Sequence, residues 1–90
     1  MFKMSWALVA EHADEWTGDD VGQAAAVMVE KVEAAVTDSG MSVDAQAHFR
    51  ETFLAPVEAS ILTTGKAAVE SGRSWSDAAG PLLVVLAPAA

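Results

Sequence analysis

The two histidines are the side chains of this sequence best suited to chemistry, and each has a glutamate three positions later. The pairs are His12 with Glu15 and His48 with Glu51. Residues three apart share one face of a helix, so two such helices could offer two imidazoles and two carboxylates to a transition metal. This spacing gives one alternative function, a small metal-binding, di-iron-like helical oligomer. The di-iron bundles, however, use the reverse order, Glu-x-x-His, which this sequence lacks.

Other sequence patterns that support catalysis or cofactor binding are not found. There is no cysteine, which removes thiol nucleophiles, disulfides and the usual structural zinc sites. No Gly-x-Ser-x-Gly elbow surrounds a serine, and the six glycines are scattered instead of forming a phosphate-binding loop. The carboxylates between Glu11 and Asp20 lack the alternating oxygen ligands of a calcium loop. We therefore expect a protein that is not an enzyme and uses no cofactor.

The charge balance restricts the partners of the protein. Its 13 acidic and 5 basic residues give a net charge of −8, which argues against nucleic acid and against a membrane as partners. An acidic inhibitor of a basic partner is a further alternative, although acidic residues also keep a 52% hydrophobic chain in solution. Residues 1–16 show no secretory signal. We expect synthesis in the cytoplasm, with incorporation into a particle or export without a cleavable signal as later fates.

Hydrophobic spacing predicts an all-α protein of three or four short helices. Apolar residues from Phe2 to Trp16 recur at steps of four and three, which is typical of a helix with one buried stripe. Asp19 or Asp20 is expected to cap the next helix, and Ser42 the one after it. Pro56 is expected to kink or break the latter, because it lacks an amide proton. The expected elements are helices over 2–16, 21–38, 42–55 and 57–71, then a turn-forming segment over 72–81 with at most one helical turn.

The stretch Trp16-Thr17-Gly18 resembles the Trp-x-Gly turn of the WXG100 family of small, acidic, secreted helical hairpins. The size, the acidity and the absence of cysteine are similar as well. That family places its motif between two helices of similar length, whereas here it follows only about 15 residues, and the chain has no tyrosine for the family's export signal. The resemblance covers three residues and is kept only as an alternative.

The sequence ends in an apolar segment, GPLLVVLAPAA, over Gly80 to Ala90. Leu82 to Ala87 lies between Pro81 and Pro88, a length that is short for a helix but sufficient for a strand. Each large apolar side chain left in water would forfeit about 1.5–3 kcal/mol, so the segment must be covered. It either lies across the helices as a lid or docks on another subunit. In the second case, removal of residues 82–90 should lower the mass of the particle or abolish partner binding.

These observations predict a helical domain over residues 1–79 and an apolar C-terminal arm or lid over residues 80–90. The expected function is a non-enzymatic protein–protein interaction or a structural subunit of a larger assembly, such as a virion or phage particle. The partner is another protein or a further copy of the chain, since tryptophan and large apolar residues are favoured at interfaces. The expected interface residues are Trp75, Leu82, Leu83, Val84, Val85 and Leu86.

Overall fold

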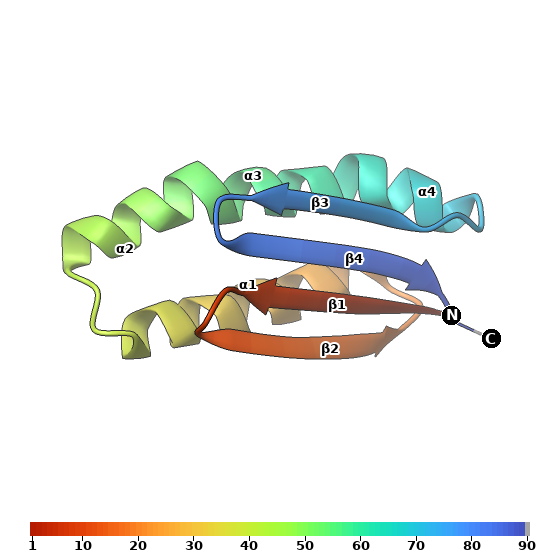
Figure 1. The fold of residues 1–90 in the computed structure, drawn as a ribbon. Helices are drawn as coiled ribbons and strands as arrows, with labels where there is room; N and C mark the ends of the chain where they lie inside the picture. Colours follow the sequence, from red (N-terminus) through yellow and green to blue (C-terminus); the bar gives the residue numbers. More distant parts are fainter. Residues whose placement is uncertain (90) are drawn as a thin grey trace.

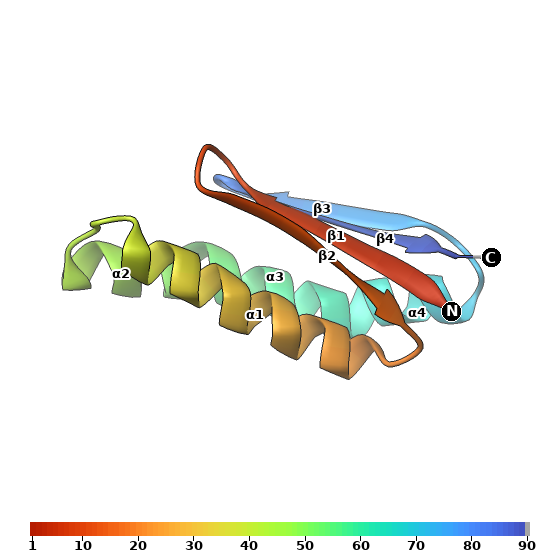
Figure 2. The same ribbon diagram turned by 90° about the horizontal axis from the view of Figure 1, so that it is seen from below.

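The fold is a two-layer arrangement of an antiparallel sheet and helices. The structure is a computed structural model and describes residues 1–89. Over these residues four strands form one sheet, and two helical segments cover one of its faces (Figures 1 and 2). The expected all-α bundle of three or four helices is therefore wrong, and the protein is mixed α and β.

The first element is a β-hairpin where the sequence analysis expected a helix over 2–16. Strands β1 (Phe2–Leu8) and β2 (His12–Gly18) pair antiparallel in a continuous register. In β1 the buried side chains alternate with more exposed ones, which is the two-residue period of a strand with one buried face. Phe2 and Trp6 fit both this period and the helical one, so they do not distinguish a strand from a helix. Val9, which the helical stripe would have buried, is 68% exposed at the turn.

The C-terminal segment forms the second hairpin. Strand β3 (Trp75–Ala79) lies within the segment expected to be turn-forming with at most one helical turn, and Gly80 turns the chain with a φ of +55° into β4 (Leu82–Pro88). The extended conformation expected for the tail is confirmed. Strand β4 lies between β1 and β3, so the sheet order is β2-β1-β4-β3 (Figure 1). The first and last strands of the chain thus make the centre of the sheet.

The helical layer matches the elements expected from the sequence more closely than the strands do. Helix α1 (Val21–Asp38) has the expected bounds, and its cap is Asp20, whose Oδ1 accepts the Gln23 amide at 3.1 Å. Ser42 caps the second helical segment, as expected, by accepting the Ala45 amide. The segment does not break at Pro56, which lies in the first turn of α3 directly after a π-helical turn, a position where a helix tolerates the missing amide proton. Its successive parts are α2 (Val43–Phe49), π-helical Arg50–Leu54, α3 (Ala55–Ser60), π-helical Ile61–Gly65 and α4 (Lys66–Glu70).

The hydrophobic core lies between the two layers. Alternate residues of β1 and β4 point toward the helices, and each helical segment packs one apolar stripe against them. The layers approach closely at Gly65, where an added Cβ would lie 2.9 Å from Leu86 Cδ1 and 3.0 Å from the Trp75 ring. The most completely buried large side chains are Met4, Met28, Val32, Val36, Val57, Ile61, Leu82, Val84 and Leu86.

Candidate functional site

The two histidines have local partners and do not come together. Nε2 of His12, on β2, accepts the indole N–H of Trp6 at 3.1 Å, while His48, on α2, lies 3.4 Å from the Thr52 hydroxyl. Residues three apart on a strand point to opposite faces, so Glu15 is turned away from His12 and instead pairs with Lys3 at 2.8 Å. Among residues 1–89, no group of three or more His, Asp or Glu side chains could hold a metal ion. The geometry assumed for the metal-binding alternative is not present.

Asp14 joins the outer strand β2 to helix α1. Its Oδ1 accepts the backbone amide of Glu15 at 2.8 Å, and its Oδ2 lies 3.6 Å from Nζ of Lys31. The amide hydrogen bond, with the positive charge of Lys31, lowers the pKa of the Asp14 carboxyl below its ordinary value. Because the group is exposed, we assign it a local structural role.

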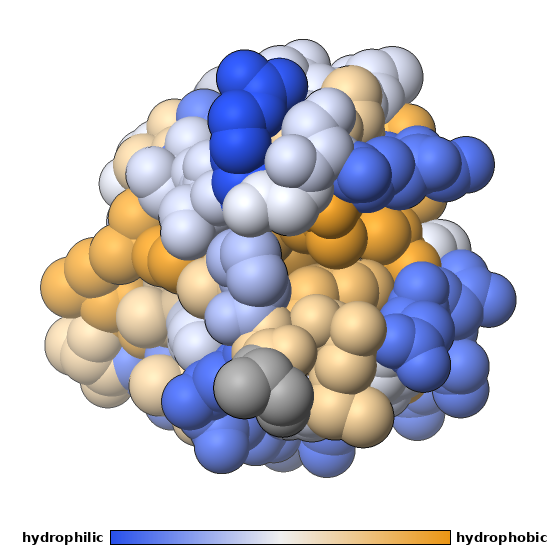
Figure 3. All heavy atoms as spheres, turned by 90° about the vertical axis from the view of Figure 1, so that its right-hand side faces the viewer, coloured by the Kyte–Doolittle hydropathy of each residue, from blue (hydrophilic) through white to orange (hydrophobic). Residues whose placement is uncertain are grey.

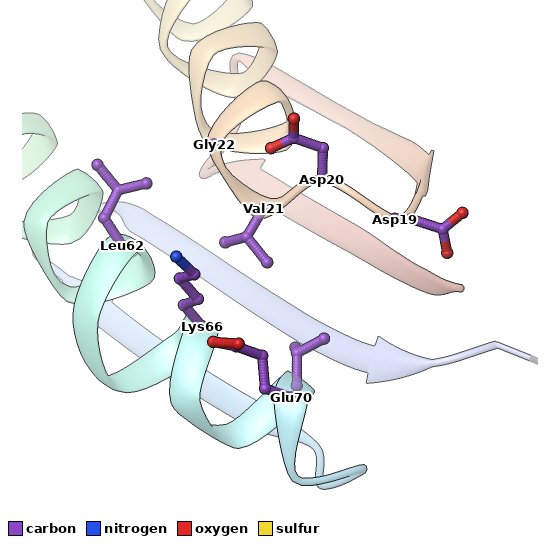
Figure 4. Close-up of a pocket in the computed structure, with 8 residues that line it drawn as sticks. Asp19, Asp20, Val21, Gly22, Leu62, Lys66 and Glu70 are labelled. Carbon is purple, nitrogen blue, oxygen red and sulfur yellow. The ribbon is translucent and has the colours of Figure 1, made fainter.

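A hollow of about 490 Å³ lies between the start of α1 and α4 (Figure 4). Its acidic rim already has structural partners: Asp20 caps α1, and the Asp19 carboxylate points away from Lys66 and lies 2.9 Å from the N-terminal amine. The remaining lining includes the apolar side chains of Val21, Leu62 and Val69. Lys66 and Glu70 of α4 also line it, so the hollow is an apolar depression with a charged rim.

The largest unexplained feature is the side of the sheet that the helices do not cover. We call it the outer sheet face, and define it by the residues that alternate with the inward-facing ones. The register places their side chains in rows across the four strands. One row is Ala13, Ala7, Leu83 and Ala78, the next is Glu15, Ser5, Val85 and Ser76, and the third is Thr17, Lys3 and Ala87.

Charge is nearly missing from the outer sheet face. It carries one of the 13 acidic residues, Glu15, and one of the 5 basic residues, Lys3, and these two form an ion pair. The net charge of −8 therefore comes entirely from the helices, the turns and the strand residues outside this face. Figure 3 views the molecule from the end that holds the termini and shows hydrophobic side chains gathered on the side of the sheet, with hydrophilic ones on the side of the helices.

Leu83 and Val85 make the centre of the outer sheet face apolar. Their side chains are 45% and 37% exposed, on a strand that pairs on both sides. Beside them, Ser5 and Ala7 are small and leave a depression of about 110 Å³ between β1 and β4. The face thus combines two projecting side chains with an adjoining shallow hollow, and such an exposed apolar surface is typical of a contact site.

The structure divides the six interface residues expected from the sequence between two places. Leu82, Val84 and Leu86 are 0% exposed in the core, and Trp75 is partly buried against it, whereas only Leu83 and Val85 reach the outer sheet face. Sequence reasoning missed their neighbours Ser5, Ala7, Ser76 and Ala78, which have no chemical signature of their own. The signal that could have found them is the two-residue alternation of FKMSWAL.

Comparisons with known proteins assign no family to the chain. No family model, no curated protein and no solved structure matches it. Over residues 1–89, no helix has both the length and the apolar character that crossing a membrane requires.

Proposed function

We propose that this protein is a non-enzymatic interaction module, and that the outer sheet face is its contact surface. The observation that carries the proposal is the exposure of Leu83 and Val85 at the centre of a nearly uncharged face, on a protein with net charge −8. Leaving such side chains in water forfeits stabilisation that a partner surface would supply.

The edges of the sheet are less suited to binding than its face. The edge strand β2 carries Asp14 and Glu15, and the opposite edge strand β3 has only five residues, with Asp77 directed inward opposite Val84. Short edges and charges of this kind discourage the addition of a further strand. Strand β4 itself is paired on both sides, so it is not free to join a partner's sheet. These features favour contact through side chains of the face.

Site-specific photo-crosslinking in living cells tests this proposal. p-Benzoylphenylalanine would replace Ala78 on the outer sheet face, and Ala59, an exposed alanine of α3, in a control chain. We expect protein adducts from position 78 that position 59 does not give. Absence of adducts at position 78, or equal adducts at both positions, would contradict the proposal.

The truncation of residues 82–90 considered from the sequence is not a usable test. It would remove the strand between β1 and β3, together with three fully buried side chains. Loss of binding by that variant would report loss of the fold, because large core side chains each contribute about 2–5 kcal/mol. Substitutions that leave the inward-facing residues intact are needed instead.

A further inference from the structure

Large and small side chains are separated between the two central strands of the outer sheet face. On β4 the exposed residues are Leu83 and Val85, and on β1 their directly paired neighbours are Ala7 and Ser5. Each projecting side chain therefore has a small residue beside it at the same height along the strands. The depression of about 110 Å³ lies at this boundary.

The boundary between β1 and β4 is also the middle of the sheet. A twofold axis running along it, in the plane of contact, would place β1 of one copy over β4 of a second copy and β2 over β3. Leu83 of each copy would then meet Ala7 of the other, and Val85 would meet Ser5. The surface is self-complementary about this axis, which an interface between identical chains requires.

The charges are compatible with the same axis. Lys3 is paired in register with Ala87, and Glu15 shares a row with Ser76, so neither charged residue would face its own counterpart in the second copy. The two helical layers, which carry half of the net charge of −8 of each chain, would point away from each other. Face-to-face contact is thus an arrangement in which two acidic chains meet with little repulsion.

We propose that the outer sheet face binds a second copy of this chain, face to face about that axis; this inference rests on the proposed function. Four strands about 4.8 Å apart and about 20 Å long present roughly 400 Å² in projection. A standard interface buries about 800 Å² of accessible surface per partner, so this contact is about half the standard size and belongs with weak, transient interfaces. The dimer should therefore form reversibly, with a dissociation constant between about 100 μM and the low millimolar range.

Sedimentation velocity of the full chain from micromolar to millimolar concentration measures this association. The wild type should shift from the 9.3 kDa monomer to twice that mass. Leu83→Ala removes the projecting side chain and Ala7→Leu fills the depression, so each variant alone should weaken the dimer at least about tenfold. Leu62→Ala is the matched control, because Leu62 is 43% exposed on the helical layer and should leave the dimer unchanged.

Mixing the two weakened variants tests the symmetry itself. In a pair made of one Ala7→Leu chain and one Leu83→Ala chain, each contact again joins one leucine to one alanine. The mixture should therefore form a heterodimer more tightly than either variant associates with itself, and the double variant should dimerise like the wild type. Circular dichroism of every variant should show the native fold, since both positions lie on the outer face.

The outcomes separate this inference from the proposed function. A monomer at all concentrations, or a dimer that the Ala7 and Leu83 variants do not affect, overturns the second-copy proposal. If the chain is monomeric and position 78 still crosslinks to a different protein in cells, only the identity of the partner is wrong. If neither self-association nor crosslinking is found, both proposals fail.

Discussion

Leu83 and Val85 differ from Leu82, Val84 and Leu86 only in their place along an extended chain. Successive strand residues point to opposite faces, so three of these five side chains fill the core and two remain on the surface. The apolar character of the segment was evident from its composition, but which residues are available to a partner depends on the pairing of β4. Which residues of β4 belong to the candidate contact site therefore depends on the face of the sheet to which each one points.

The turn of the first hairpin contains a residue in a strained conformation. Ala10 has a φ of +64°, which costs a non-glycine residue about 1–2 kcal/mol. Ala10→Gly should remove this strain, while the greater freedom of glycine in the unfolded chain offsets about 0.4–1 kcal/mol. We expect a net gain of between zero and about 1.5 kcal/mol, measured by urea unfolding. A variant less stable than the wild type would contradict the assigned conformation.

Gly80, in the turn of the second hairpin, also has a positive φ, but here the residue is already glycine and the substitution to test is its replacement by alanine. Its φ is +55°, and an added Cβ would lie 2.5 Å from the Phe53 ring. Gly80→Ala should therefore lower the free energy of unfolding by about 2 kcal/mol, through backbone strain and steric overlap together. A change of less than about 0.5 kcal/mol would show that the turn rearranges, since surface substitutions free of such features have effects of that size.

At the level of elements, the helices were predictable because two independent signals agreed. The 3.6-residue pattern of α1 is preceded by Asp20 and followed by Ser39-Gly40, and Ser42 marks the next start. Strand β1 was ambiguous because Phe2 and Trp6 satisfy both periods. Strands β2 and β3 carry little signal of their own, since HADEWTG and WSDAA are short and largely polar or small. Their extended conformation is specified by pairing with β1 and β4.

The second helical segment contacts the sheet at Gly65. Alanine favours a helix over glycine by about 1 kcal/mol, so propensity alone predicts that Gly65→Ala stabilises the protein. Its Cβ would, however, press on Leu86 and Trp75, and overpacking costs about 1–3 kcal/mol. We expect a net loss of about 1 kcal/mol in thermal or urea unfolding. Greater stability than the wild type would contradict the close approach of the two layers.

Ala59→Gly is the control for that substitution. Ala59 is exposed on α3, so its replacement should cost only the difference in helix propensity, about 1 kcal/mol. Gly65→Ala and Ala59→Gly, although opposite substitutions, would then both destabilise the protein. Helix propensity alone predicts opposite effects, so a loss of stability in both variants shows that Gly65 is packed against the sheet.

For the whole molecule, the decisive feature is a pairing between the two ends of the chain. Strands β1 and β4 are separated by the entire helical layer in sequence, yet they are neighbours at the centre of the sheet. Local patterns do not encode such long-range pairing, which is why the tail was expected as a separate arm or lid. The same pairing creates the outer sheet face, because it brings Leu83 and Val85 beside Ala7 and Ser5.

Backbone amide chemical shifts, followed by NMR on dilution from millimolar to micromolar concentration, can show whether the outer sheet face is a contact surface that binds a second copy. Binding of a second copy should give shift changes confined to outer-face residues of the four strands, largest around Ala7 and Leu83, with α1 and α3 unaffected. Shifts independent of concentration, or changes centred on the helices, would contradict it.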